Sequence, residues 1–174
     1  MIADSEKYKQ YISQVATWLS RGVPDREASL LKLERELFLS FFYVRKLIEA
    51  KKLSGTVITQ SHRVEWHPVT GRVDHLNWHR LDDFVDFSEQ SNEPRDLEFI
   101  CNRFVHSFIF APATEAKQVT DILVATDRDR GRDRKIYRFP ISLLSALLTT
   151  VGEDNQAQGK WERDTSGLLT TTLG

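Results

Sequence analysis

The sequence predicts an α+β fold, made of an antiparallel helical pair, a third helix packed against the pair, and a small antiparallel β-sheet or hairpin. Apolar residues recur at three-and-four spacing in several segments, which is typical of amphipathic helices. Runs of β-branched and aromatic residues flank turn sequences elsewhere. With 174 residues, 40% of them hydrophobic, the chain has enough apolar surface for one domain. Disordered, collagen-like and disulfide-scaffold classes are therefore excluded.

The first two helices are predicted from apolar stripes. Residues 5–20 form the first stripe, and the Gly-Val-Pro sequence within residues 21–24 ends that helix. We expect the second helix to begin near Asp25, whose carboxylate can cap exposed amide groups, and to end near Lys52. Its wide apolar face indicates packing on two sides, and the short link makes the two helices antiparallel neighbours.

The middle of the chain changes from strand to helix signals. Residues 55–78 are rich in β-formers and are expected to hold one or two short strands, whereas residues 88–93 have the composition of a polar linker. A third helix is predicted to begin near Pro94, since proline suits the first helical position, and to extend to Phe110.

Two apolar segments near the end of the domain predict a hairpin. Residues 119–126 and 135–141 flank a loop, residues 127–134, that alternates arginine with aspartate. We interpret this loop as a solvated tip that protects the sheet edge from pairing with other chains. Residues 142–151 then show helical spacing of leucines and predict a short helix.

The expected organisation is a single α+β domain over residues 1–151 and a polar C-terminal tail over residues 152–174. A single cysteine, Cys101, rules out an intramolecular disulfide and favours a reducing compartment. No apolar run reaches the length of a membrane span, and the N-terminus lacks the features of a signal peptide. We therefore expect a cytoplasmic protein that does not bind membranes.

The charge balance limits how nucleic acid can be bound. The chain has 24 basic and 25 acidic side chains. Such a balance provides no global attraction to a polyanion. Any RNA must therefore be held at a small, structured site.

The predicted third helix has a polar group on its second face. Asn102 and His106 are four residues apart and share this face, and Arg103 lies within reach of His106. Aromatic and apolar residues frame the pair, so this is not an ordinary solvated surface. The arrangement indicates a contact site for another helix or another subunit. The residues that frame the polar pair are Phe99, Ile109 and Phe110.

The segment from Cys101 to His106, with the helical pair that precedes it, resembles proteins of the HEPN superfamily. Members of that superfamily are helical-bundle ribonucleases and RNA-binding modules, common in toxin–antitoxin and antiviral (phage-defence) systems. Their signature is an arginine, usually followed by a polar residue, and a histidine four to six positions after the arginine. Asn102 and His106 match this signature, but Cys101 stands at the arginine position. The resemblance implies a HEPN-like helical bundle whose site lies at a homodimer interface.

The resemblance also implies a metal-independent ribonuclease site without cofactors. His106 would exchange a proton with the ribose hydroxyl or the leaving oxygen, and a guanidinium would stabilise the charge on phosphorus. Because Cys101 replaces the arginine, the cation must come from Arg103 or from Arg45, which antiparallel helices can bring near His106. The candidate site is thus His106, Asn102, Arg103 and Arg45, in an RNA-binding protein or a weak or lapsed ribonuclease.

Alternative interpretations stay open. His106 can instead be a structural histidine that hydrogen-bonds within a helix interface. The protein can also be a non-enzymatic accessory subunit that uses the aromatic face of the third helix to bind a protein partner.

Four histidines cluster in the middle of the chain. His75 and His79 have the spacing of helical metal ligands, but no cysteine accompanies them and a helix is doubtful there. We therefore interpret the four histidines as clustered by chance, with no metal site. The other two members of the cluster are His62 and His67.

Overall fold

An antiparallel sheet of six strands lies at the centre of the protein, in a computed structural model that describes residues 4–71, 73–74, 76–126 and 134–155 and the backbone of residues 160–163 and 169–172. The central strands follow the order β4, β5, β6, β2, β3, and β1 pairs with the start of β5. The strands are β1 (Val23–Pro24), β2 (His62–Pro68), β3 (Ser91–Arg95), β4 (Ser107–Glu115), β5 (Gln118–Thr126) and β6 (Lys135–Pro140).

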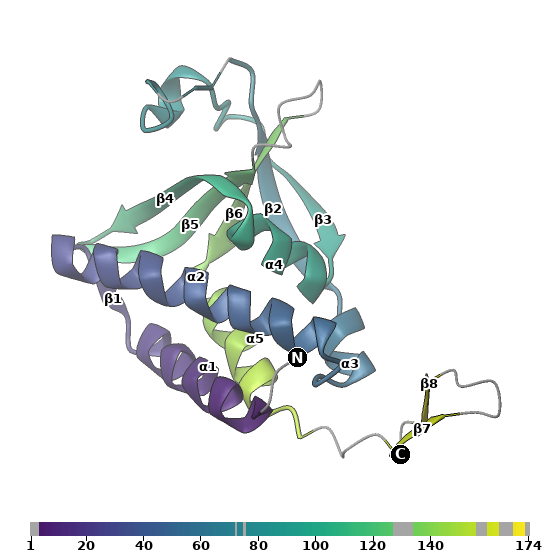
Figure 1. The fold of residues 1–174 in the computed structure, drawn as a ribbon. Coiled ribbons are helices and arrows are strands. Elements are labelled where there is room, and N and C mark those ends of the chain that lie inside the picture. The colour runs from purple at the N-terminus through teal and green to yellow at the C-terminus, as the bar shows by residue number, and fades with distance from the viewer. Residues whose placement is uncertain are drawn as a thin grey trace.

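Helices cover one face of this sheet (Figure 1). α4 packs against α2 beside the sheet, and α1 packs against α5 and α2. The main core fills the space between the helices and strands β2, β5 and β6. The helices are α1 (Ser5–Ser20), α2 (Glu27–Glu49), α3 (Gly55–Thr59), α4 (Leu97–Val105) and α5 (Ile141–Glu153).

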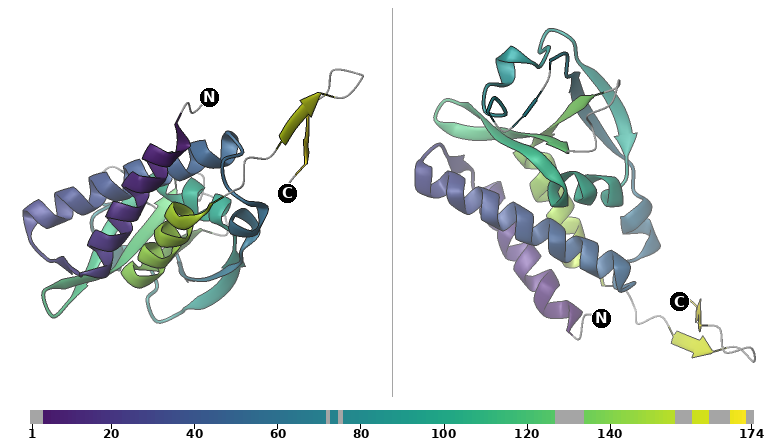
Figure 2. Two further views of the ribbon diagram at one scale, coloured as in Figure 1. Left: turned by 90° about the horizontal axis from the view of Figure 1, so that it is seen from below. Right: turned by 45° about the horizontal axis from the view of Figure 1, so that its top comes forward.

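The long connection between β2 and β3 covers the opposite face (Figure 2). Phe84 and Val85 from this connection are buried against Ile109 of β4 and Ile136 of β6. A short 3-10 turn, Leu81–Asp83, lies within the connection. Each face of the sheet therefore carries a core, and the smaller second core lies under this segment.

The predicted fold class, a HEPN-like helical bundle with a small hairpin, is wrong. The sheet has six strands and organises the fold, because two of its strands come from segments that were expected to be linker and helix. Part of the expected linker and Pro94 form the edge strand β3. Residues after His106 leave the helix and pair with β5 as β4, so inter-strand hydrogen bonds replace helical ones.

Helix α4 is shorter than the sequence predicted. The helix was expected to begin near Pro94 but begins at Leu97, after Asp96, whose carboxylate caps it by accepting the Phe99 amide at 2.8 Å. Its end is His106, whose backbone leaves the helical region. The segment after Ser54 was also expected to be a strand, but the Ser54 hydroxyl accepts the Val57 amide and starts helix α3.

Other expected elements are confirmed. α1 has the predicted bounds, α5 covers the predicted short helix, and β5 pairs with β6 as a hairpin.

α2 begins after Arg26 and not at Asp25. Most of the charged tip, residues 127–133, lies outside the described residues, and two paired strands, β7 (Lys160–Arg163) and β8 (Leu169–Thr172), lie within the expected tail.

Candidate functional site: a polar cleft between two helices

A cleft of about 300 Å³ opens between the C-terminal part of α2 and helix α4. Both helices and the last residue of β5 contribute side chains to it, and most of these side chains are polar or charged. All four candidate site residues line it: Arg45, Asn102, Arg103 and His106. The other lining residues are Ile48, Glu49, Glu98, Phe99, Cys101 and Thr126.

Aromatic stacking positions α4 against α2. The rings of Phe41 and Phe104 are stacked with centroids 4.2 Å apart, and both side chains are buried. Because the buried side of α4 is fixed in this way, its other side presents Asn102 and His106 to the cleft. The His106 amide also donates to the Asn102 carbonyl at 3.1 Å, which holds the end of the helix.

Arg45 and His106 are in direct contact across the cleft. Arg45 Nη1 lies 2.9 Å from His106 Nε2. A guanidinium has no acceptor, so Nε2 must accept this hydrogen bond and the ring proton must be on Nδ1. The contact therefore fits the tautomer of His106 that carries its proton on Nδ1.

Glu49 holds the other side of the Arg45 guanidinium. Arg45 Nε donates to Glu49 Oε1 at 2.9 Å, and Lys46 donates to Glu49 Oε2 at 2.6 Å. Hydrogen bonds from Lys46 and Arg45 lower the pKa of Glu49, so its carboxylate stays charged. Arg45 is thus oriented by two partners, one on its own helix and one on α4.

Arg103 lies toward the sheet. Its guanidinium carbon is 4.5 Å from the centre of the Phe99 ring and 5.2 Å from that of Tyr137. Its Nη1 donates to the Thr126 hydroxyl at 3.4 Å. Arg103 therefore links the cleft to strands β5 and β6.

Cys101, at the arginine position of the motif, is fully buried. Burial raises the pKa of its thiol, so the thiol stays protonated and is no nucleophile. Cys101 faces the core, and the guanidinium in contact with His106 comes from Arg45 of α2.

Sequence reasoning missed Glu49, Glu98 and Thr126 as residues of the cleft. Glu49 had a usable signal, because it follows Arg45 by four residues on a helix. Thr126 had none, since it reaches the cleft only through the position of β5 in the sheet.

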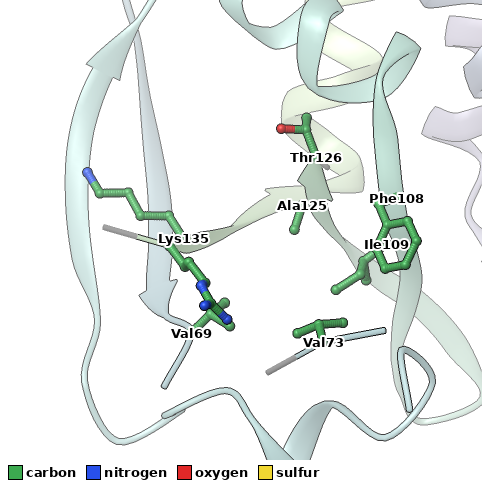
Figure 3. Close-up of a pocket in the computed structure, with 8 residues that line it drawn as sticks. Val69, Val73, Phe108, Ile109, Ala125, Thr126 and Lys135 are labelled. Atoms are coloured by element: carbon green, nitrogen blue, oxygen red, sulfur yellow. The ribbon is translucent and has the colours of Figure 1, made fainter. Parts of the chain in front are cut away.

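A second, smaller cavity lies under the β2–β3 connection and has a volume of about 30 Å³ (Figure 3). Val69, Val73, Phe108 and Ile109 form its mostly apolar wall. Its volume suits about one water molecule and no larger ligand.

The expected aromatic helix face does not form in the structure. Ile109 and Phe110 belong to strand β4, so only Phe99 of the three lies on the helix. Ile109 is buried in the second core, and Phe110 packs beside Phe38 with ring centroids 5.1 Å apart.

The histidine cluster is dispersed where it is described. His67 is buried, with Nδ1 2.9 Å from the Glu89 carbonyl and Nε2 3.2 Å from Glu65. His75 lies outside the described residues. Within the described ranges, no group of three or more histidine, cysteine or acidic side chains is arranged to hold a metal ion.

Comparison with family models, with curated proteins and with solved structures finds no match to this chain. Within the part of the chain that the structure describes, every helix is too short or too polar to cross a lipid bilayer.

Proposed function

We propose that the cleft between α2 and α4 binds single-stranded RNA and cleaves its backbone without a metal ion, with His106 as proton acceptor and Arg45 as the phosphate-binding cation. The observation that supports this most directly is the 2.9 Å contact between Arg45 Nη1 and His106 Nε2. Two side chains this close can act on one phosphodiester group.

The proposed reaction begins when phosphate enters the cleft. A phosphate oxygen is a stronger acceptor for a guanidinium than a neutral imidazole, because the hydrogen bond is assisted by charge on both partners. Arg45 then turns to the phosphate, and the Nε2 lone pair of His106 becomes available. Glu49 keeps Nε of Arg45 in place during this change.

The chemical step transfers one proton and exchanges one bond at phosphorus. His106 Nε2 takes the proton of the ribose 2′-hydroxyl, and the 2′-oxygen attacks phosphorus as the bond to the 5′-oxygen breaks. The leaving 5′-oxygen takes a proton from solvent, and His106 returns its proton to solvent. The products are a 2′,3′-cyclic phosphate and a 5′-hydroxyl, and Arg45 stabilises the added charge on the phosphate.

Asn102 and Arg103 complete the site. Asn102 lies one turn before His106 and offers an amide to the ribose or base. Arg103 supplies a second guanidinium toward the sheet. The buried Cys101 takes no part in the reaction.

The test is degradation of labelled total RNA in the presence of EDTA. We expect His106→Ala to slow cleavage by at least about 100-fold, the size typical of a general base. Arg45→Ala should slow it about 100- to 1,000-fold, as loss of a charge-stabilising donor does. Arg35→Ala is the matched control, since Arg35 also bonds a neighbouring glutamate on α2 but lies outside the cleft.

Two outcomes would contradict the proposal. One is intact RNA after incubation with the wild-type protein, which would overturn the proposed cleavage. The other is equal degradation by wild type and His106→Ala, which would indicate a contaminating nuclease.

The same proposal includes three further points. The composition favours a cytoplasmic location. The motif resemblance favours a homodimer and a role in toxin–antitoxin or phage-defence systems. The mass in solution, measured by analytical ultracentrifugation, tests the dimer. A monomer at high concentration would count against it.

A further inference from the structure

A second group of aromatic and charged side chains lies on the sheet next to the cleft. Trp66 of β2 is the register partner of Tyr137 of β6, and Val64 of β2 is the partner of Glu93 of β3. Since register partners share a face, these side chains lie on the helix-covered side of the sheet. We call this group the sheet track and define it by five residues: Trp66, Glu93, Arg95, Lys135 and Tyr137.

Cations lie over aromatic rings along this track. Lys135 Nζ is 4.0 Å from the centre of the Trp66 ring. The guanidinium carbon of Arg95 is 4.2 Å from the centre of the Phe99 ring, which Arg103 also contacts. Alternating rings and cations suit single-stranded nucleic acid, whose bases stack on rings while its phosphates bind cations.

One carboxylate holds the track together without cancelling its charge. Glu93 accepts hydrogen bonds from Lys135 at 2.8 Å, from Arg95 at 2.7 Å and from the Tyr137 hydroxyl at 2.6 Å. Burial raises the pKa of Glu93, but these three bonds outweigh burial and lower it to about 2. Two cations therefore share one carboxylate, and the group keeps a positive excess.

The track is continuous with the cleft. Phe99 and Arg103 line the cleft, and Arg103 also lies over the ring of Tyr137. The ring of Tyr137 packs edge-on to Phe99 with centroids 5.2 Å apart. Phe99 and Arg103 therefore join the cleft to the sheet track.

We infer that the RNA bound in the cleft continues over the sheet track, where a base stacks on Trp66 and a phosphate binds Lys135. This inference rests on the proposed function, because it needs RNA in the cleft. It makes the preferred ligand a single-stranded oligonucleotide of several residues. A mononucleotide or dinucleotide fills only the cleft, and duplex RNA hides the base faces that Trp66 would contact.

The test compares RNA lengths. Fluorescence anisotropy would measure binding of 2′-O-methyl oligouridine, which lacks the attacking hydroxyl, as a dinucleotide and as a twelve-residue strand. We expect the longer strand to bind wild type at least about tenfold more tightly, since each stacked base commonly contributes that much. Trp66→Ala should lose most of this gain and leave dinucleotide binding unchanged.

Lys135→Gln is the second variant, and it removes the charge of a half-buried side chain while keeping most of its volume. Glutamine still donates to Glu93 but has no charge, so the salt dependence of binding should weaken by about 0.7 in the slope of log K against log salt for each lost phosphate contact. Lys32→Gln is the matched control, because Lys32 Nζ lies 4.4 Å from the centre of the Trp18 ring, away from the cleft and the track. It should bind both strands as wild type does.

Three results would each overturn the inference. The twelve-residue strand binds wild type no more tightly than the dinucleotide, or Lys135→Gln keeps the wild-type dependence of binding on salt. The third is that duplex RNA binds as tightly as the single strand. The failure of the inference is distinguishable from that of the proposed function. Cleavage that depends on His106 without any length effect would overturn the track alone. Length-dependent binding that Lys135→Gln weakens, without cleavage, would support the track and overturn the proposed chemistry.

Discussion

Arg45 Nη1 and His106 Nε2 lie 2.9 Å apart although 61 residues separate them in the chain. The contact exists because the stacked Phe41 and Phe104 rings hold α2 against α4. A cation from α2 thereby lies beside His106, whereas Cys101 of α4 is buried.

Glu49 is predicted to act as a positioning residue for Arg45. In Glu49→Ala the guanidinium loses the partner of Nε, so we expect kcat for RNA cleavage to fall about tenfold through misorientation. KM should stay equal or decrease, since a negative charge has left the cleft. Glu49→Gln should recover much of kcat because its amide oxygen can still accept from Nε. Glu34→Ala, an exposed change on the same helix, is the control, and a wild-type kcat in Glu49→Ala would contradict the role.

The tautomer of His106 is a second prediction. Nitrogen NMR of the free protein should show a protonated Nδ1 and an unprotonated Nε2, because Arg45 can only donate to Nε2. Arg45→Ala should remove this preference and shift the Nε2 resonance. Observation of a proton on Nε2 in the neutral wild-type ring would show that the two side chains do not make this bond.

Glu93 should make stability depend on acid. Its pKa is lowered to about 2 from 4.5, so its contribution is fully present above about pH 4.5 and disappears as the pH falls toward 2. The difference in unfolding free energy between wild type and Glu93→Gln should therefore shrink by about 1 to 2 kcal/mol over this interval. Urea unfolding at pH 7, 4 and 2.5 measures it. Glu98→Gln, an exposed change on α4, is the control variant, and a constant difference for Glu93→Gln would refute the assignment.

The contact between α1 and α5 needs a glycine. A Cβ at Gly152 would press against the Ser13 hydroxyl and lie 3.2 Å from the Lys9 carbonyl oxygen. We expect Gly152→Ala to lower the unfolding free energy by about 1 to 3 kcal/mol, the usual result of overpacking. Gly55→Ala is the matched control, since a Cβ there meets no atom within 4 Å. Thermal unfolding checks both, and adding Ser13→Ala should restore part of the loss in Gly152→Ala.

The sequence alone was sufficient for the elements that carry their own periodic signal. Helix α1, helix α5 and the β5–β6 hairpin agree with the predictions because their apolar spacing matches the face that they bury. The prediction was wrong where local signals conflicted with long-range pairing. Residues of β4 carry aromatic side chains that fit a helix continuing from α4, and only the hydrogen bonds to β5 make them a strand.

In the candidate site, too, the sequence determined some features and the tertiary structure determined others. Asn102, Arg103 and His106 were found in the sequence because they lie within two turns of one helix, where spacing determines direction. Their environment was decided by tertiary structure: the contact of Arg45 with His106, the orientation of Arg45 by Glu49, and the link from Arg103 to Tyr137. These contacts join α2, α4 and the sheet, and a linear pattern cannot specify them because they arise only when the main core between the helices and the sheet is packed.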